Sequence, residues 1–357
     1  MRRGCVLFLA VMCGCLAASR LAADYIKGAS YFAQGKYDLA IKEYEEELRL
    51  DPAYVQGHYI VGLCYARLQN YDKAIAALSQ AQALDKKDFQ IALALAQAYF
   101  DAHRYADLKE ALNTASLNAQ NPADLNKLKF LSATALFNQE DYTQALPELH
   151  AALASNPKDA VLLSEIGIAQ FHLKNYDEAI AALTKAVAEK PDDAQTALFL
   201  GESYFARALA LTPGRERTMG FTEGFRLGEK WAVKQPQNFD AVSLAGRAAL
   251  ALKNYSQAES FLKRAVQLQP DSAVAQFSLG QAYAFEGKLA DAESALTKAS
   301  ASLSNEPALY SILGFVLEKE NKLEAAQAAY EKANSLSPSK ETQSSLDRVK
   351  QKIGSSH

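Results

Sequence analysis

The stretch that decides the fold is "IGIAQFHLKNYDEAIAALTKA", residues 166–186, because the chain repeats it with small changes. Residues 279–299 read "LGQAYAFEGKLADAESALTKA", and similar stretches occupy residues 61–81 and 245–265. In each stretch apolar residues recur three or four positions apart on both sides of a polar turn. This spacing predicts two amphipathic helices joined by a turn, used many times along the chain.

The repeat has a regular period. Its first marker is a small residue, found at Gly28, Gly62, Ala96, Ala133, Gly167, Gly201, Gly246, Gly280 and Gly314. The steps between markers are 34 residues, except for one step of 37 and one of 45. An alanine lies twelve residues after most markers, at Ala40, Ala74, Ala145, Ala179, Ala258, Ala292 and Ala326. Proline closes six units, at Pro52, Pro157, Pro191, Pro236, Pro270 and Pro338.

A period of 34 residues with these residue types resembles the tetratricopeptide repeat. The resemblance implies an all-α, right-handed superhelical solenoid of about nine helix–turn–helix units. We expect units 1–3 in residues 24–122 and units 4–9 in residues 123–340. A capping helix is expected over residues 341–353, where Leu346, Val349 and Ile353 form one apolar stripe, followed by a disordered tail over residues 354–357.

Small residues in the repeat have a physical reason, because they let the two helices of a unit approach each other closely. No unit can bury its apolar face alone, so neighbouring units share one continuous core. Three extra residues between units three and four predict a looser junction near residues 122–126. Pro147 lies inside the second helix of unit four, where we expect a mild bend at most.

Unit six, residues 194–238, carries an 11-residue insert that breaks the period, and the unit contains "TPGRERTMGFTEGFRLGEKW", residues 212–231. We expect two long helices that form a projecting hairpin. Its first helix should run to Leu211, and Thr212 should cap a second helix that begins at Pro213. The tip offers Arg215 and Arg217 as a contact site for a partner.

Gly220, Gly224 and Gly228 are four residues apart, so they lie on one face of that second helix. Each costs about 1 kcal/mol relative to alanine in a helix interior. We interpret the three glycines as a packing face for the extended first helix, with Trp231 filling the volume nearby. Association of membrane helices through glycine is the alternative, but the charges in this stretch argue against a bilayer.

The N-terminus predicts export. The basic start "MRRG" precedes the apolar run "CVLFLAVMCGCLAA", and small residues follow, so residues 1–23 form a candidate export signal with cleavage after Ser19 or Ala23. An uncleaved anchoring helix is the alternative. The "MCGC" stretch also resembles a bacterial lipoprotein box with Cys15 as the lipid-bearing residue, the one expected link to a membrane. We therefore expect an exported protein, in the periplasm or cell envelope if the source is bacterial.

The sequence offers no catalytic constellation. Its five histidines show no metal-ligand spacing, and neither a phosphate-binding loop nor a serine nucleophile elbow occurs. Three of the four cysteines lie in the export segment, which leaves only Cys64. The net charge of −3, or −6 after loss of Arg2, Arg3 and Arg20, gives no case for nucleic acid. We expect no enzyme, no metal and no cofactor.

Binding is expected on the concave face of the solenoid. The resemblance implies that positions 2, 5, 9, 12 and 13 of each unit face this groove. The apolar side chains expected there are Tyr25, Phe32, Tyr59, Leu63, Phe100, Phe130, Phe137, Ile168, Phe171, Phe205, Phe277, Phe285 and Phe315. Positions five and nine carry no lysine–asparagine pair, so ligands held by the family's carboxylate clamp are not expected.

Two functions are compatible with these features. The first is an exported scaffold that binds a peptide or protein segment in the groove. The alternative is a structural subunit of a multiprotein cell-envelope assembly, of the secretion, pilus or outer-membrane biogenesis type. Aromatic side chains serve both core packing and contact surfaces, so the groove residues are open to either role.

Overall fold

The structure, a computed structural model, describes residues 27–355. These residues form helices and turns, and no strand occurs among them. The helices belong to two compact units, one ending at Pro157 and the other beginning at Lys158. The predicted export segment over residues 1–23, with Cys15, lies outside the described residues, as does Tyr25.

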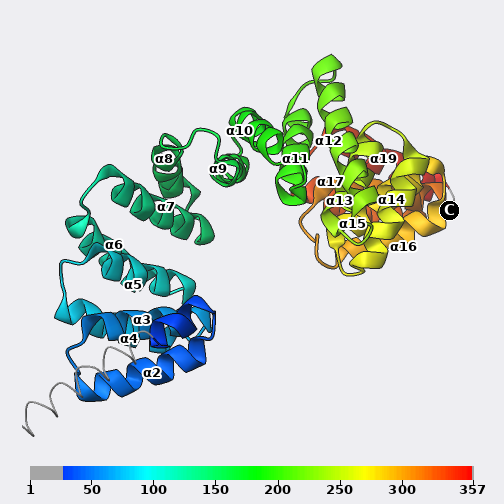
Figure 1. The fold of residues 1–357 in the computed structure, drawn as a ribbon. Helices are drawn as coiled ribbons and strands as arrows, with labels where there is room; N and C mark the ends of the chain where they lie inside the picture. Colours follow the sequence, from blue (N-terminus) through cyan, green and yellow to red (C-terminus); the bar gives the residue numbers. More distant parts are fainter. Residues whose placement is uncertain (1–26, 356–357) are drawn as a thin grey trace, which may run out of the picture. The chain divides into compact units, whose positions relative to one another are not determined.

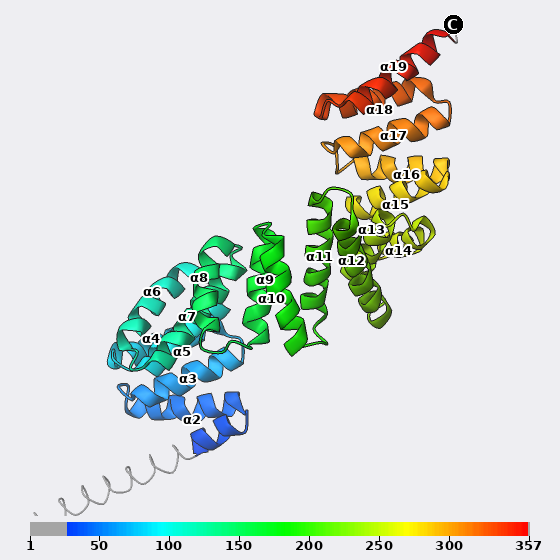
Figure 2. The same ribbon diagram turned by 90° about the horizontal axis from the view of Figure 1, so that it is seen from above.

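The first unit consists of antiparallel helix pairs stacked in chain order (Figures 1 and 2). Residues 27–33 are the described part of its first helix. The helices that follow are α2 (Tyr37–Leu50), α3 (Val55–Arg67), α4 (Tyr71–Leu84), α5 (Phe89–Asp101), α6 (Tyr105–Asn118), α7 (Pro122–Asn138) and α8 (Tyr142–Leu153).

The second unit contains five helix pairs and one terminal helix (Figure 2). Its helices are α9 (Ala160–His172), α10 (Tyr176–Glu189), α11 (Ala194–Ala210), α12 (Arg215–Lys234), α13 (Phe239–Ala251), α14 (Tyr255–Leu268), α15 (Ala273–Glu286), α16 (Leu289–Ser300), α17 (Pro307–Lys319), α18 (Leu323–Leu336) and α19 (Lys340–Ser355).

The all-helical repeat fold expected from the sequence is confirmed, and two boundaries need correction. The compact units divide after Pro157 rather than between residues 122 and 123. Among the consecutive helices from α2 to α8, however, α6 and α7 pack against each other most sparsely. The three extra residues lie between these two helices, at the junction where looser packing was expected. The terminal helix includes Gly354 and Ser355, so the first half of the predicted disordered tail is helical. Helix α8 continues through Pro147.

Four hairpins of the described residues bring a glycine into close contact with a leucine. A Cβ atom on Gly62 would lie 2.5 Å from Leu78 Cγ, and one on Gly280 would lie 2.7 Å from Leu296 Cγ. Both leucines are fully buried. Each glycine therefore leaves room for a leucine sixteen residues later, which explains why both residue types recur with the 34-residue period.

The turn inside most hairpins uses a left-handed residue. Eight of the nine hairpins have one, and the exception is α11–α12. The residues are Gly35, Gln69, His103, Glu140, Lys174, Lys253, Gly287 and Asn321, with φ between 56° and 80°. The next amide closes the turn, as when Asn70 N–H donates to the carbonyl of Tyr65 over 2.9 Å. This is the Schellman arrangement, in which glycine is the favoured residue.

Replacing Lys253 with glycine should stabilise the second unit by about 0.5–1 kcal/mol. The left-handed conformation costs an L-residue about 1–2 kcal/mol, and the entropy of glycine in the unfolded chain offsets part of the gain. Lys253 is exposed, so its side chain gives up little packing. Urea denaturation checks the result, with Gly287→Ala as the reverse change that should lower stability. A loss of stability in Lys253→Gly would contradict the argument.

The insert forms the expected long hairpin, but its turn differs from the prediction. Helix α11 has 17 residues and α12 has 20, against 13 or 14 in most other helices of the second unit. The pair projects beyond its neighbours (Figure 1). Helix α12 begins at Arg215 after Gly214, so Thr212 does not cap it and Pro213 is not its first residue.

The three glycines of α12 face two different helices. A Cβ on Gly220 would lie 2.8 Å from Ala208 Cβ, and one on Gly224 would lie 3.2 Å from the carbonyl oxygen of Gly201, so both face α11. Gly228 instead faces α13, with the backbone nitrogen of Ala245 2.6 Å from a hypothetical Cβ. The expectation that all three glycines pack on the first helix is wrong for Gly228.

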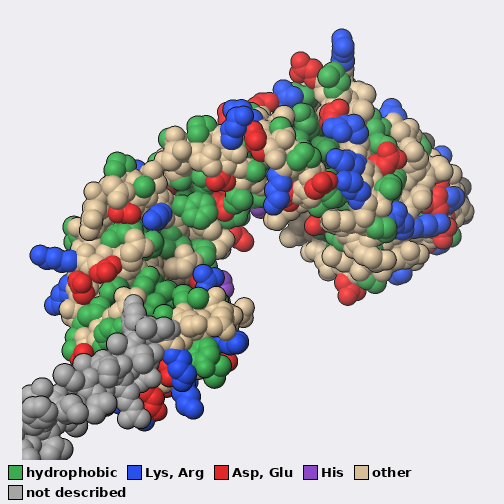
Figure 3. All heavy atoms as spheres, in the orientation of Figure 1, with side chains coloured by type: hydrophobic (Ala, Val, Ile, Leu, Met, Phe, Trp, Pro, Cys, Tyr) green, Lys and Arg blue, Asp and Glu red, His purple; other side chains and the backbone are tan. Residues whose placement is uncertain are grey.

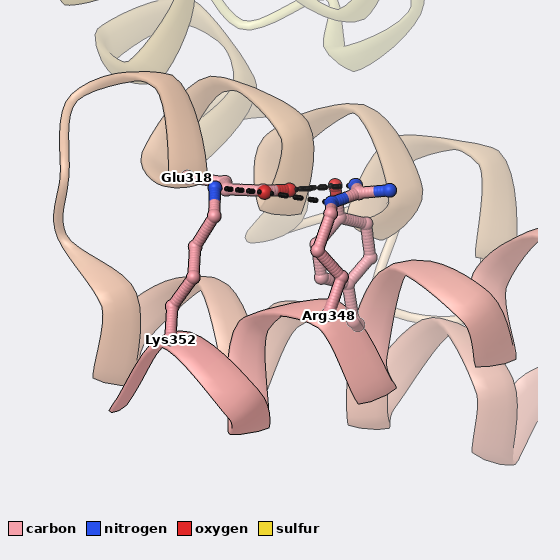
Figure 4. Close-up of polar contacts among 4 residues, drawn as sticks. Glu318, Arg348 and Lys352 are labelled. Atoms are coloured by element: carbon pink, nitrogen blue, oxygen red, sulfur yellow. Dashed lines mark hydrogen bonds and ion pairs between the residues drawn. The ribbon is translucent and has the colours of Figure 1, made fainter. Parts of the chain in front are cut away.

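The terminal helix α19 is attached by a buried carboxylate. Glu318 of α17 has a side chain only 7% exposed, and it accepts hydrogen bonds from Arg348 and Lys352 (Figure 4). Arg348 donates from Nε and Nη2 over 2.9 and 2.8 Å, and Lys352 donates over 2.7 Å. Tyr330 Oη also donates, over 3.3 Å. The hydrogen bond from Arg348 is the main reason that the pKa of Glu318 falls to about 2.

Acid should therefore loosen the attachment of α19. The pKa of Glu318 is 4.5 in an unperturbed chain, so below about pH 5 the unfolded chain binds the proton first. The stabilisation is complete above that pH and is lost as pH falls to about 2. We expect a loss of about 1–2 kcal/mol, reduced because Arg348 and Lys352 are half exposed. Denaturation of Glu318→Gln should lack this pH dependence, whereas the exposed-acid control Glu324→Gln should retain it.

Candidate functional site

An open pocket of about 570 Å³ lies in the first unit, lined by the first helix of each of three successive repeats. We call it the α3–α5–α7 pocket. Helix α3 contributes Tyr59, α5 contributes Leu93, and α7 contributes Phe130, all from the fifth position of successive repeats. Phe130 is 41% exposed, an unusual amount for a phenylalanine. Hydrophobic side chains are frequent on the face of the first unit seen in Figure 3. The geometry therefore offers an apolar surface to a ligand.

Polar groups surround these three side chains. The remaining lining residues are Gln90, Ala94, Gln97, Ala123, Asn126, Lys127 and Leu131. Burial, and then the charge of Asp88, raises the pKa of Tyr59, so its phenol stays protonated and can donate a hydrogen bond. Lys127 is half exposed and lies 3.7 Å from the Asp124 carboxylate. The α3–α5–α7 pocket thus combines an apolar centre with hydrogen-bonding groups.

Phenylalanines at the twelfth position close their own hairpins. Phe32, Phe100, Phe137 and Phe171 each contact the tyrosine that begins the following helix. The ring centroids lie 5.9, 6.5, 5.5 and 5.9 Å apart for contacts with Tyr37, Tyr105, Tyr142 and Tyr176, respectively. Their recurrence has a sufficient cause in packing within the repeat. Leu63, at the ninth position of α3, is half-buried.

In the second unit, several predicted groove residues are packed rather than open. Ile168 and Phe205 are only 6% and 8% exposed, so neither presents a contact surface. Phe277 is partly buried against the core of its repeats. Phe285 is 56% exposed and stacks on Tyr255 with ring centroids 5.2 Å apart, and Phe315, 39% exposed, lies beneath Lys319.

An ion pair joins two first helices of the second unit. Glu202 of α11 pairs with Arg247 of α13, and the Arg247 guanidinium lies 5.1 Å from the centre of the Phe205 ring. Burial raises the pKa of Glu202, although Arg247 opposes this rise. Both residues stand at the ninth position of their repeats. There the second unit carries a charged pair where the first unit has Leu63 and Gln97.

The pocket also contains residues that the sequence interpretation did not select. Gln90 and Gln97 are at the second and ninth positions, which the repeat register already assigns to the groove. A search for polar as well as apolar residues in this register would have found them. Ala123 comes from the additional N-terminal turn of α7, and the register of the repeat does not predict it.

The predicted contact residues at the insert have unequal surroundings. Arg215 is exposed at the tip of the hairpin, where Lys and Arg side chains are visible at the top of Figure 3. Arg217 is half-buried, donates to the carbonyl of Leu211 over 3.3 Å, and lies 5.5 Å from the centre of the Phe221 ring. Arg217 therefore stabilises the turn, and Arg215 is the one of the two that extends toward solvent.

The described residues offer little support for catalysis or metal binding. Within residues 27–355, no three His, Cys, Asp or Glu side chains are grouped so that they could hold a metal ion. Cys64 is buried, and its burial raises the pKa of the thiol to about 11. Little of this thiol is ionised at neutral pH, so it is a poor nucleophile.

Over the same described range, none of the helices combines the length and the apolar character that a bilayer crossing requires.

Solved structures and one curated protein resemble the chain. A tetratricopeptide repeat protein from Parabacteroides merdae aligns with 73% of this chain and 98% of its own, at 17% identity and a TM-score of 0.51, which supports the fold alone. Yeast Tom70 aligns with 89% of this chain and 76% of its own, at 18% identity and a TM-score of 0.39. The Hsp70-Hsp90 organising protein of Plasmodium falciparum is 30% identical over 113 residues, which are 30% of this chain and 20% of that protein. The chain thus spans about a fifth of the length of that relative.

The chain also matches models of one protein family. Models described as the tetratricopeptide repeat match residues 27–89, 130–194, 249–314 and 307–340, which together are more than half of the chain. The matched segments coincide with helix pairs that carry the 34-residue period. The chain therefore belongs to the tetratricopeptide repeat family.

Proposed function

We propose that this protein is a binding scaffold that holds a peptide or protein segment in the α3–α5–α7 pocket. The observation that carries the proposal is the convergence of Tyr59, Leu93 and Phe130 from three successive repeats on one open pocket. An apolar centre with a few polar groups at its edge is the usual form of a ligand site. Tyrosine and phenylalanine supply large contact areas at low entropic cost.

The double substitution Tyr59→Ala, Phe130→Ala should weaken partner binding at least tenfold. Buried aromatic anchors commonly contribute more than 1 kcal/mol each, and about 1.4 kcal/mol corresponds to tenfold in affinity. The measurement is a titration of a partner captured by the unmodified chain, carried out on the unmodified chain and on the double variant. Tyr59 packs partly against the core of its repeats and Phe130 is exposed, so the double variant should melt at a lower temperature, and circular dichroism should confirm that its helices remain at the temperature of the titration.

A matched control distinguishes the effect of changing the pocket from the effect of removing any exposed apolar side chain. Val161 and Val274 are 50% and 49% exposed on first helices of the second unit, outside the pocket. The double variant Val161→Ala, Val274→Ala should bind the partner with unchanged affinity. Equal binding by the pocket variant and the unmodified chain would reject the proposal.

A second candidate function is a structural subunit of a cell-envelope assembly, and the projecting α11–α12 hairpin favours it. Its exposed side chains include Leu209 and Met219, at 55% and 56%, and Arg215. Removal of residues 208–219 should release the chain from such an assembly in a native-mass measurement. A free pool near the chain mass of 38.9 kDa in unmodified cells would argue against this function.

Both proposed functions place the chain outside the cytoplasm. This location is proposed from the sequence of residues 1–23 alone. N-terminal sequencing of the mature chain distinguishes cleavage after Ser19 or Ala23 from retention of the segment. Incorporation of labelled fatty acid that is lost in Cys15→Ser would establish the lipid anchor. A full-length chain in the cytoplasmic fraction would reject export.

A further inference from the structure

Helix α7 borders an open space on each of two flanks. On one flank lies the α3–α5–α7 pocket of about 570 Å³, and on the other lies a cavity of about 440 Å³ between α6 and the α7–α8 pair. We call the second space the α6–α8 cavity. The two spaces have no lining residue in common, so α7 separates them.

Three rows of side chains run along α7 with the helical period. The middle row, Leu128, Leu131 and Ala135, is buried against α5 and α6. The rows on either side of it line the two spaces, because residues three or four positions apart share a face of a helix. The row that lines the pocket is Ala123, Asn126, Lys127 and Phe130, and the row that lines the cavity is Ser132, Leu136 and Gln139. The middle row therefore lies between the pocket and the cavity.

The middle row meets α6 over a surface with little relief. In the clusters that it forms, the buried residues of α6 are Leu108, Ala111 and Ala115, and the two alanines have no side-chain atom beyond Cβ to interlock with α7. Helices α6 and α7 also make the sparsest contact between consecutive helices from α2 to α8. By contrast, α7 and α8 pack closely, so they can move as one body. Packed helices slide or tilt by small amounts in this way.

We infer that α7 and α8 tilt as a pair about the middle row, and that this motion sets the width of the α3–α5–α7 pocket. When α8 moves toward α6, the cavity shrinks and Phe130 moves away from Leu93, which widens the pocket. The opposite tilt narrows the pocket and enlarges the cavity. A bulky ligand side chain would therefore gain its room from the cavity, a regulation of the site that rests on the proposed function.

The test measures the distance between spin labels on α4 and α8 of the full chain by double electron–electron resonance. Ala76→Cys and His150→Cys supply exposed labelling positions, Cys64 is buried, and the three cysteines within residues 1–23 are replaced by serine. Neither labelled position lines the pocket or the cavity. Because α8 lies across the cavity from α6, and α6 neighbours α4, this distance follows the width of the cavity.

Filling each space should shift this distance in opposite directions. Ser132→Leu fills the cavity, so it should lengthen the α4–α8 distance by about 1–2 Å. Ala94→Leu fills the pocket from α5, so it should shorten the distance by a similar amount. Ser116→Leu makes the same exchange as Ser132→Leu at an exposed position of α6 outside both spaces, and it should leave the distance unchanged.

A second variant fills the cavity from its other side. Ala106→Leu lies at an exposed position of α6 and should lengthen the distance as Ser132→Leu does, with circular dichroism confirming that the helices of each variant remain. Unchanged distances in the filled variants, or shifts of the same sign for pocket and cavity, would overturn the inference. None of these measurements requires a ligand, so their failure is distinguishable from a failure of the Tyr59→Ala, Phe130→Ala binding test.

Discussion

Replacing Gly228 with alanine should destabilise the second unit by about 3 kcal/mol. A Cβ at this position would lie 2.6 Å from the backbone nitrogen of Ala245 and 3.1 Å from the carbonyl oxygen of Ala241. Alanine would otherwise gain about 1 kcal/mol over glycine in a helix interior. The steric term prevails because backbone atoms of α13 must move, and α13 is buried along most of its length.

Urea denaturation followed by tryptophan fluorescence measures this loss, since Trp231 is the only tryptophan in the chain and lies in the same helix. Gly354→Ala is the matched control, because a Cβ there meets nothing within 4 Å. That control should be neutral or slightly stabilising. Unchanged denaturation of Gly228→Ala would mean that α12 and α13 can separate at low cost, and the close packing would then have another explanation.

Removal of the tryptophan side chain should lower the stability of the second unit at least as much as Gly228→Ala. Trp231→Ala is expected to cost about 3–5 kcal/mol, the usual range when a large buried aromatic side chain is truncated. The side chain is only 2% exposed. The ammonium groups of Lys230 and Lys234 lie 5.6 and 5.0 Å from the centre of its ring, and Lys234 also pairs with Asp192 over 3.0 Å. Far-ultraviolet circular dichroism during denaturation is the measurement, because the fluorophore is absent.

Trp231→Phe keeps an aromatic ring at this position and removes the indole nitrogen. The buried indole Nε1 has no hydrogen-bond partner among the described residues, so its removal sacrifices no hydrogen bond. Phenylalanine should therefore cost only about 1–2 kcal/mol, mainly from the smaller buried area. If Trp231→Phe proved as costly as Trp231→Ala, the indole nitrogen would have an energetic role that its surroundings do not explain.

The candidate site was only partly predictable from the sequence. Tyr59 and Phe130 follow from the register of the repeat, and they line one pocket. The same register selected Ile168 and Phe205, which are buried. A register assigns a residue to a face of its helix, but the packing of neighbouring helices decides how much of that residue reaches solvent. For this reason the register alone does not distinguish Phe130, which is 41% exposed, from Phe205, which is 8% exposed.

The sequence by itself determined the repeat and the glycine–leucine contacts within four of its hairpins. A glycine and a leucine sixteen residues apart meet across one short turn, so local spacing is sufficient to predict their contact. Only the tertiary structure decided which helix each glycine of α12 faces, where α12 begins, and that the chain divides at residues 157–158. It also revealed a cavity between α6 and the α7–α8 pair. These features depend on the step between successive repeats, which arises from many weak contacts between helices distant in sequence and has no local signature.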